Sequence, residues 1–138
     1  MTKSKFLLPL DGTEKSLNSI NWFKKLFSSE EAEVTLMNVL EFYYRPDITA
    51  FDDISYETSR DGSARYLDRA EKMLEGYEVN KLIIGGASAD EILKEAESGR
   101  YDMIIMTKSS AKGITKFIGS VTSKVVRNSS VAVIVIPE

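Results

Sequence analysis

The chain of 138 residues contains no cysteine and no histidine. Without cysteine, disulfide bonds, thiolate nucleophiles and thiolate metal ligands are excluded. Without histidine, the chain lacks the commonest general base near neutral pH, every catalytic triad built on histidine and nearly every kind of zinc site. Chemistry at neutral pH would therefore have to come from Asp, Glu, Lys or Tyr side chains, or from a metal ion held by carboxylates.

The sequence also lacks a strong excess of one charge sign and a long apolar run. Its net charge is −3, and the charged residues, 28% of the chain, carry both signs along its length. This pattern argues against a nucleic-acid-binding surface and against a polybasic membrane patch. Because no apolar run reaches about 18 residues and no secretory signal pattern is present, we expect a cytoplasmic protein without a membrane segment. The length and the 43% of hydrophobic residues fit one domain over residues 1–138.

The familiar glycine-rich nucleotide motifs are missing as well. The absence of G-x-x-x-x-G-K-S/T excludes a P-loop, and no G-x-G-x-x-G occurs, although Gly85 and Gly86 follow a candidate strand. No pair of acidic residues stands out as an acid–base dyad.

What the sequence does contain is a regular alternation of strand and helix patterns. Short apolar runs predict strands at 5–11, 33–40, 80–86, 101–106 and 131–137. Apolar residues at helical spacing predict helices at 12–27, 64–74, 88–97 and 119–128. In the helix at 88–97, Ser88 and Glu91 have the spacing of a capping box. Strands that are apolar on both faces and alternate with helices predict a doubly wound, five-stranded parallel sheet in a Rossmann-like α/β sandwich.

One predicted connection, residues 41–62, has no sustained period and is long for a compact domain. Such a loop could pack its tyrosines on the edge of the sheet, or it could form a lid over a ligand.

A ligand site is expected beyond the carboxyl ends of the strands, where the strand order reverses. Asp11, after the first strand, could bind a ligand hydroxyl or amine or Mg²⁺, or it could simply cap the next helix. Backbone groups at the end of the second strand, in NVLE (38–41), could read the edge of a flat base, or the strand could simply end there. Gly119 and Ser120 open a helix whose free N–H groups and dipole favour an anion, or Ser120 is only an N-cap.

Two further features belong to the same region. Thr122 adds a second hydroxyl near the start of the last helix. Lys108, Lys112 and Lys116 stand four residues apart, and they could reach phosphates or form a solvated face.

Four stretches in their order resemble the universal stress protein family, over essentially the whole chain. They are FLLPLDGTEKS (6–16), VTLMNVLE (34–41), IIGGASADEILKEAESGRYDMIIM (83–106) and FIGSVTSKVVRNSSVAVIVIP (117–137), of which the last is the most specific. The resemblance implies a five-stranded parallel sheet in an adenine-nucleotide-binding α/β fold, and a homodimer that is often made through the last strand. One group of the family binds ATP through a G-x2-G-x9-G-S/T signature after the fourth strand, and another group lacks it. Neither group has a well-defined general enzymatic reaction, and the roles lie in stress survival and signalling.

The resemblance also implies roles for single residues. Asp11 matches a nucleotide-contacting aspartate, with Pro9 and Leu10 flanking it, and Val39 matches the position whose backbone meets adenine. The phosphate-binding end of the signature is matched by Gly119, Ser120, Val121 and Thr122.

The front half of the signature departs from the family pattern. Strict spacing puts Met106 and Ser109 at the two earlier glycine positions, and an alignment with one deletion puts Thr107 and Ser110 there. Glycine allows positive φ and a close backbone approach to phosphate, which a β-branched threonine tolerates less. The resemblance therefore implies either a degenerate site or one that reads its ligand with side chains.

Two functions from different classes remain. The first is a dimeric stress-response or signalling protein that weakly binds ATP, ADP or AMP, with or without Mg²⁺. The alternative is a nucleotide-free dimeric interaction module on the same scaffold. A slow ATPase is a third idea, in which Asp11 or a bound metal would activate water. We expect a homodimer in each case, because SVAVIVIPE (130–138) would be an apolar edge strand without charge until Glu138.

Overall fold

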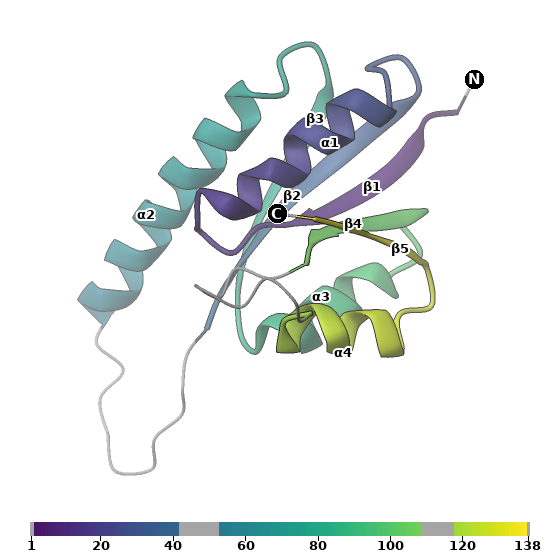
Figure 1. Cartoon of the computed structure of the whole chain (residues 1–138). Helices are drawn as coiled ribbons and strands as arrows, with labels where there is room; N and C mark the ends of the chain where they lie inside the picture. Colours follow the sequence, from purple (N-terminus) through teal and green to yellow (C-terminus); the bar gives the residue numbers. More distant parts are fainter. Residues whose placement is uncertain (1, 42–52, 109–117, 138) are drawn as a thin grey trace.

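A computed structural model of the chain describes residues 2–41, 53–108 and 118–137, with the backbone alone at 53–58. Within these residues, five parallel strands form one sheet in the order β3-β2-β1-β4-β5 (Figure 1). The strands are β1 (Ser4–Pro9), β2 (Ala32–Leu40), β3 (Glu78–Gly85), β4 (Met103–Thr107) and β5 (Ala132–Ile136). The predicted five-stranded parallel sheet is confirmed.

The central strands are buried on both faces because successive side chains of a strand point to opposite sides. In β1, Phe6 and Leu8 belong to one hydrophobic cluster, and Leu7 between them belongs to the other. All three side chains are at most 2% exposed. This burial explains why the strand reads as a continuous apolar run rather than as an alternating one.

Helices cover both faces of the sheet (Figure 1). A short 3-10 turn, η1 (Lys15–Leu17), leads into α1 (Asn18–Leu26), which packs with α2 (Asp53–Lys72) on one face. On the other face lie α3 (Ser88–Ala96) and α4 (Ser120–Asn128). An ion pair between Lys124 of α4 and Asp90 of α3, at 2.6 Å, joins the two helices of this second layer. The chain is thus a doubly wound α/β sandwich, as predicted.

The predicted irregular loop at 41–62 is wrong for residues 53–62, which form the first half of α2. This stretch, DISYETSRDG, offers only Ile54 and Tyr56 as large apolar residues, so helical periodicity cannot reveal it. The helix predicted at 64–74 therefore begins 11 residues earlier than expected, at Asp53. The choice between a lid and tyrosine packing concerns mainly residues 42–52, which lie outside the described residues.

The order of the strands fixes where a ligand site can form. From β1 the chain moves outward to β2 and β3 on one side and later to β4 and β5 on the other. The strand order therefore reverses between β1 and β4, and all strands end at the same edge because they are parallel. In the described part of the chain, no helix has the length and apolar character that a membrane span requires.

Candidate functional site

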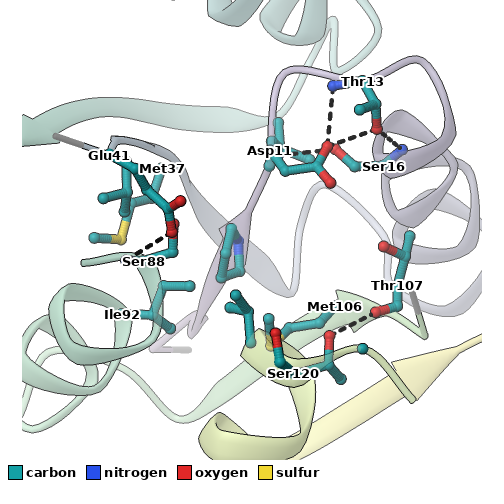
Figure 2. A pocket seen from close by; sticks show the side chains of 16 residues that line it. Asp11, Thr13, Ser16, Met37, Glu41, Ser88, Ile92, Met106, Thr107 and Ser120 are labelled. Carbon is teal, nitrogen blue, oxygen red and sulfur yellow. Dashed lines mark hydrogen bonds between the residues drawn. The ribbon is translucent and has the colours of Figure 1, made fainter. Parts of the chain in front are cut away.

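A cavity of about 490 Å³ lies at this reversal point, beyond the carboxyl ends of β1, β2 and β4. This volume is in the range of small-molecule sites, roughly 300–1,000 Å³. The starts of α3 and α4 close it from the second helical layer (Figure 2). The described residues that line it are Pro9, Leu10, Asp11, Thr13, Ser16, Met37, Val39, Glu41, Ser88, Ile92, Met106, Thr107, Gly119, Ser120, Val121 and Thr122.

The structure brings together every site residue predicted from sequence that it describes. The predicted members of the lining are Pro9, Leu10, Asp11, Val39, Met106, Thr107, Gly119, Ser120, Val121 and Thr122. The remaining predicted residue, Ser110, lies outside the described residues.

Of the six further lining residues, Glu41 belongs to the stretch NVLE (38–41), whose backbone was predicted to read a base. Sequence reasoning missed the other five: Thr13, Ser16, Met37, Ser88 and Ile92. Thr13 and Ser16 follow Asp11 closely, so a search of the whole turn would have found them. Ser88 and Ile92 come from α3, which has no neighbour in sequence among the predicted residues. The fold topology could have predicted them, since α3 begins at the same edge of the sheet at which the strands end.

Asp11 shapes the turn after β1 instead of capping an α-helix. Its Oδ1 atom accepts hydrogen bonds from the backbone N–H of Thr13 at 3.0 Å and from the Thr13 hydroxyl at 2.6 Å. The Thr13 hydroxyl oxygen in turn accepts from the N–H of Ser16 at 3.2 Å. Asp11 therefore forms an Asx turn and does not cap α1, since α1 begins only at Asn18. The Asp11 residue also lines the cavity.

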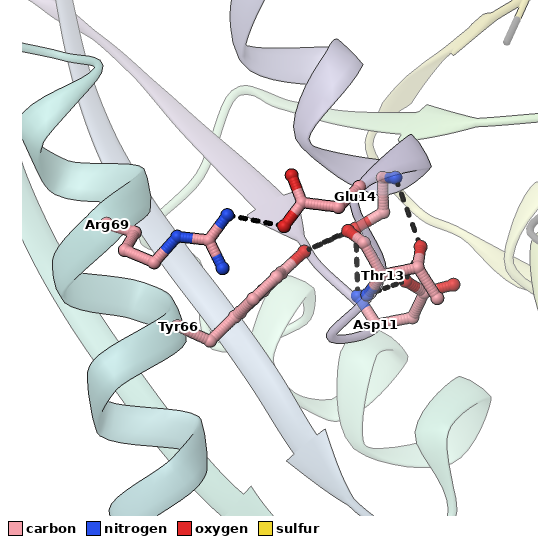
Figure 3. Close-up of polar contacts among 6 residues, drawn as sticks. Asp11, Thr13, Glu14, Tyr66 and Arg69 are labelled. Atoms are coloured by element: carbon pink, nitrogen blue, oxygen red, sulfur yellow. Dashed lines mark hydrogen bonds and ion pairs between the residues drawn. The ribbon is translucent and has the colours of Figure 1, made fainter.

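The same turn is held from the side by α2 (Figure 3). The phenol of Tyr66 donates to the carbonyl oxygen of Thr13 at 2.8 Å, and its oxygen lies 2.8 Å from the Ser16 hydroxyl. Arg69, one turn further along α2, pairs with Glu14. Because burial removes water from the phenolate form, the pKa of Tyr66 is raised from 10.0 to about 12.

A buried amide adds a second attachment. Asn38 of β2 donates to the carbonyl oxygen of Leu10 at 2.7 Å, and its own carbonyl oxygen accepts from the Ser63 hydroxyl of α2 at 2.5 Å. Asn38 and Ser63 are each 6% exposed. The backbone next to Asp11 is therefore fixed by both β2 and α2.

On the opposite wall, the start of α4 faces the cavity. Its N-cap is Gly119, in an extended conformation, so the reading of Ser120 as the N-cap is wrong. The first hydrogen bond within the helix runs from the N–H of Ser123 to the carbonyl oxygen of Gly119 at 2.8 Å. The N–H groups of Ser120 to Thr122 therefore have no partner within the helix, and the helix dipole favours an anion there.

The end of β4 supports this helix start. The Thr122 hydroxyl donates to the carbonyl oxygen of Thr107 at 3.0 Å, and the N–H of Gly119 donates to that of Lys108 at 3.0 Å. Met106 and Thr107, which the two alternative alignments put at the first altered glycine position, are ordinary strand residues. Among the described residues, no non-glycine residue has positive φ. Neither threonine nor methionine adopts the positive φ that glycine would allow at these positions.

The far end of the cavity is formed by β2 and α3. Met37 and Ile92 are buried and give it an apolar wall, and Glu41 lies above them (Figure 2). Glu41 Oε1 accepts a hydrogen bond from the backbone N–H of Ser88 at 3.3 Å. The predicted capping box of Ser88 and Glu91 is wrong, since the N-cap of α3 is Ala87 and no side-chain cap bond is made. The carboxylate that accepts from the Ser88 N–H comes instead from Glu41, the residue after β2.

Negative charge dominates the described lining, in which Asp11 and Glu41 are the only ionisable residues. Lys108 is described but is not part of the lining, and Lys112 and Lys116 lie outside the described residues. In the part of the chain that the structure describes, no group of three or more acidic side chains could hold a metal ion. The arrangement suits a partly apolar molecule with hydroxyl groups and, at the α4 end, one anionic group.

The sequence matches the family model of the Universal stress protein family over residues 3–137. The chain is 28% identical over 139 aligned positions to Universal stress protein MJ0531 of Methanocaldococcus jannaschii, with 96% of this chain and 81% of the relative covered. Universal stress protein UspA from Lactobacillus plantarum shares the fold with a TM-score of 0.77 at 20% identity, and 99% of each chain is covered.

Several neighbours of the same fold hold adenine nucleotides. A universal stress protein of Arabidopsis thaliana with bound AMP has a TM-score of 0.64 at 16% identity, covering 96% of this chain and 90% of that one. Two other universal stress proteins, one of them from Archaeoglobus fulgidus, have been solved in complex with cAMP and with dAMP, at 17% and 16% identity. Together with the family match over nearly every residue, the sheet order and the helical layers lead to one conclusion: this chain belongs to the universal stress protein family.

Proposed function

We propose that the protein binds an adenine nucleoside or mononucleotide in the cavity at the ends of β1, β2 and β4, as part of a role in the stress response or in signalling. The observation that carries this proposal is the convergence on one cavity of the Asp11 carboxylate, an apolar wall and the start of α4. A sugar hydroxyl would donate to Asp11, and a phosphate would accept from the N–H groups of α4. Neighbours solved with AMP, cAMP and dAMP add support.

The charges of the described lining favour a ligand of low negative charge. Asp11 and Glu41 place two carboxylates in the described lining, and a carboxylate disfavours a phosphate close to it. The α4 start is therefore the favourable place for an anion, and it is suited to one phosphate better than to three. We expect adenosine and AMP to bind at least as well as ATP.

The experiment is mass spectrometry of purified, denatured protein, followed by calorimetric titration with adenosine, AMP and ATP. A weakly held ligand leaves during purification, so the titration decides the matter. Binding of adenosine or AMP supports the proposal. Absence of heat with all three at millimolar concentration contradicts it.

The second candidate function is a nucleotide-free interaction module that acts as a homodimer. The observation in its favour is β5, which stands at the edge of the sheet with Val133, Ile134 and Val135 half-buried. An apolar edge strand pairs readily with another strand unless it is covered. Two copies related by a two-fold axis would pair their β5 strands antiparallel, and Pro137 would end the ladder. The dimer is compatible with nucleotide binding as well.

A further inference from the structure

One wall of the cavity is the turn at residues 11–16, and this turn is held by a side chain that is not part of the described lining. Asp11, Thr13 and Ser16 belong to the lining, whereas Tyr66 of α2 does not. Tyr66 is 7% exposed, and its phenol reaches the turn from α2 (Figure 3). Tyr66 can therefore affect a ligand in the cavity through the turn.

A path of hydrogen bonds leads from the backbone of Asp11 to the phenol. The N–H of Asp11 donates to Ser16 Oγ at 3.1 Å, and this oxygen lies 2.8 Å from the hydroxyl oxygen of Tyr66. The phenol in turn donates to the carbonyl oxygen of Thr13 at 2.8 Å. Because the phenol has one proton and gives it to Thr13, the Ser16 hydroxyl is the donor to Tyr66. The bonds thus run in one direction, from the Asp11 N–H through both hydroxyls to Thr13.

The backbone of this turn needs an external support. It contains Gly12 at a φ of 88°, and glycine adopts positive and negative φ about equally readily, so this residue does not fix its neighbours by itself. The ion pair of Arg69 with Glu14 also reaches the turn, but both side chains are exposed and water competes with such a pair. Ser16 is only 2% exposed, so without the phenol its hydroxyl would lack an acceptor in a place that water hardly reaches.

We propose that Tyr66 is a positioning residue for the ligand site, which fixes the turn at 11–16 through the Ser16 hydroxyl and the Thr13 carbonyl in the shape that a bound nucleoside contacts. This inference rests on the proposed function and adds to it the residue that prepares the site. A wall that is ordered before the ligand arrives raises the affinity, because binding then costs less conformational freedom. Burial raises the pKa of Tyr66 to about 12, so the phenol keeps the proton that it donates throughout the neutral range.

The test is calorimetric titration of adenosine into the wild type, Tyr66→Phe and Tyr77→Phe at neutral pH. Tyr77→Phe is the matched control, since the Tyr77 phenol also donates to a backbone carbonyl oxygen, that of Phe27, at 2.7 Å. Neither Tyr77 nor Phe27 is part of the described lining or of the turn. Urea unfolding of the same samples should show that both variants are folded and lose comparable stability. A role of Tyr66 in stability alone would then leave the affinity of both variants at the wild-type value.

Tyr66→Phe should weaken adenosine binding by roughly 3- to 10-fold, which is the effect of about one net hydrogen bond, and Tyr77→Phe should stay within about twofold of the wild type. Unchanged affinity in Tyr66→Phe, or equal weakening in the two variants, overturns the positioning role while leaving the binding function standing. A wild type that binds neither adenosine nor AMP contradicts the binding function and removes this inference with it.

Ser16→Ala gives a second measurement along the same path. It removes the acceptor of the Asp11 N–H and the donor to Tyr66. Because both hydroxyls act in one path, adding Tyr66→Phe to Ser16→Ala should weaken adenosine binding less than Tyr66→Phe alone does. Additive losses would show that Tyr66 does not act through Ser16 and would overturn the proposal.

Discussion

The side-chain amide of Asn38 in β2 donates a 2.7 Å hydrogen bond to the carbonyl oxygen of Leu10, the residue before Asp11. Asn38→Ala removes this donor and also leaves the Ser63 hydroxyl without the acceptor that it reaches at 2.5 Å. We expect the free energy of unfolding to fall by about 1–3 kcal/mol, because buried polar groups lose their partners. Urea unfolding measures the loss.

The control for this prediction is Asn80→Ala, the same substitution at an exposed residue of β3, which should change stability by less than about 0.5 kcal/mol. A double-mutant cycle with Ser63→Ala should show that the two losses are not additive. Additive losses would mean that Asn38 and Ser63 act independently.

The raised pKa of Tyr66 implies that the protein loses stability at alkaline pH. Burial raises its pKa from 10.0 to about 12, so the folded state holds the phenol proton more tightly than the unfolded chain does. This contribution is complete below pH 10 and is lost as the pH rises toward 12, by up to roughly 2–3 kcal/mol. Tyr101, whose pKa is also raised to about 12, mainly by burial and then by its hydrogen bond to Glu95, acts in the same window.

The measurement is urea unfolding of the wild type and of Tyr66→Phe at pH 8, 10 and about 11.5. The variant should start lower, because Thr13 loses a donor, and should then lose less stability across the alkaline range. Parallel pH profiles for the two proteins would refute the assignment.

Ser120→Asp tests whether a phosphate lies at the start of α4. A carboxylate at the first helical residue should stabilise the helix by about 0.3–1 kcal/mol through its dipole. The same charge should weaken AMP binding by roughly tenfold or more and leave adenosine binding nearly unchanged. Calorimetry with both ligands gives the answer, and equal weakening of the two would place the phosphate elsewhere.

The altered front half of the family signature predicts weak ATP binding. Each lost hydrogen bond between backbone and a charged phosphate oxygen costs roughly 1.5–3 kcal/mol, so two losses weaken binding by roughly 10²- to 10⁴-fold. Thr107→Gly with Ser110→Gly should raise ATP affinity and leave adenosine unchanged. Titrations in low and high salt separate any contribution of Lys108, which salt would screen. Tight, salt-insensitive ATP binding by the wild type would show that the replacements serve as well as glycine.

If the proposed homodimer pairs its β5 edge strands, a charge placed on β5 should separate it. Val135→Lys should give a monomer in sedimentation or light scattering at micromolar protein, because a buried lysine without a partner is costly at such an interface. Val135 is preferable to Val133, which packs against the second hydrophobic cluster. Leu26→Lys, at a 48% exposed residue of α1, is the control and should remain a dimer. A wild-type monomer would contradict the proposal outright.

The strands of the sheet could be predicted from sequence because each is marked by a pattern of neighbouring residues. Each strand is a short apolar run between turn residues, and the predicted and observed bounds of β2, 33–40 and Ala32–Leu40, nearly coincide. The first half of α2 could not be predicted, since a polar helix segment has no periodic apolar face. The capping box failed for a different reason: Glu41, 47 residues from Ser88 in sequence, approaches the N–H that a local pattern assigns to a nearby side chain.

The candidate site was predictable where residues lie at or just after the end of a strand, as Thr107 and Asp11 do. It was not predictable where a helix of another segment approaches the same edge, as α3 does with Ser88 and Ile92. Hydrogen bonds such as that of Tyr66 to Thr13 join residues far apart in sequence, so the spacing of residues along the chain cannot predict them.

The turn that carries Asp11 is attached to α2, in one helical layer, whereas Ser88 and Ser120 begin helices of the other layer. The ion pair between Asp90 and Lys124 ties the two helices of that second layer together. A small molecule that contacts Asp11 and Ser120 at once would therefore link the two helical layers across the end of the sheet. We expect the bound molecule to oppose separation of the layers, whereas without it each layer could respond separately to heat or to a partner.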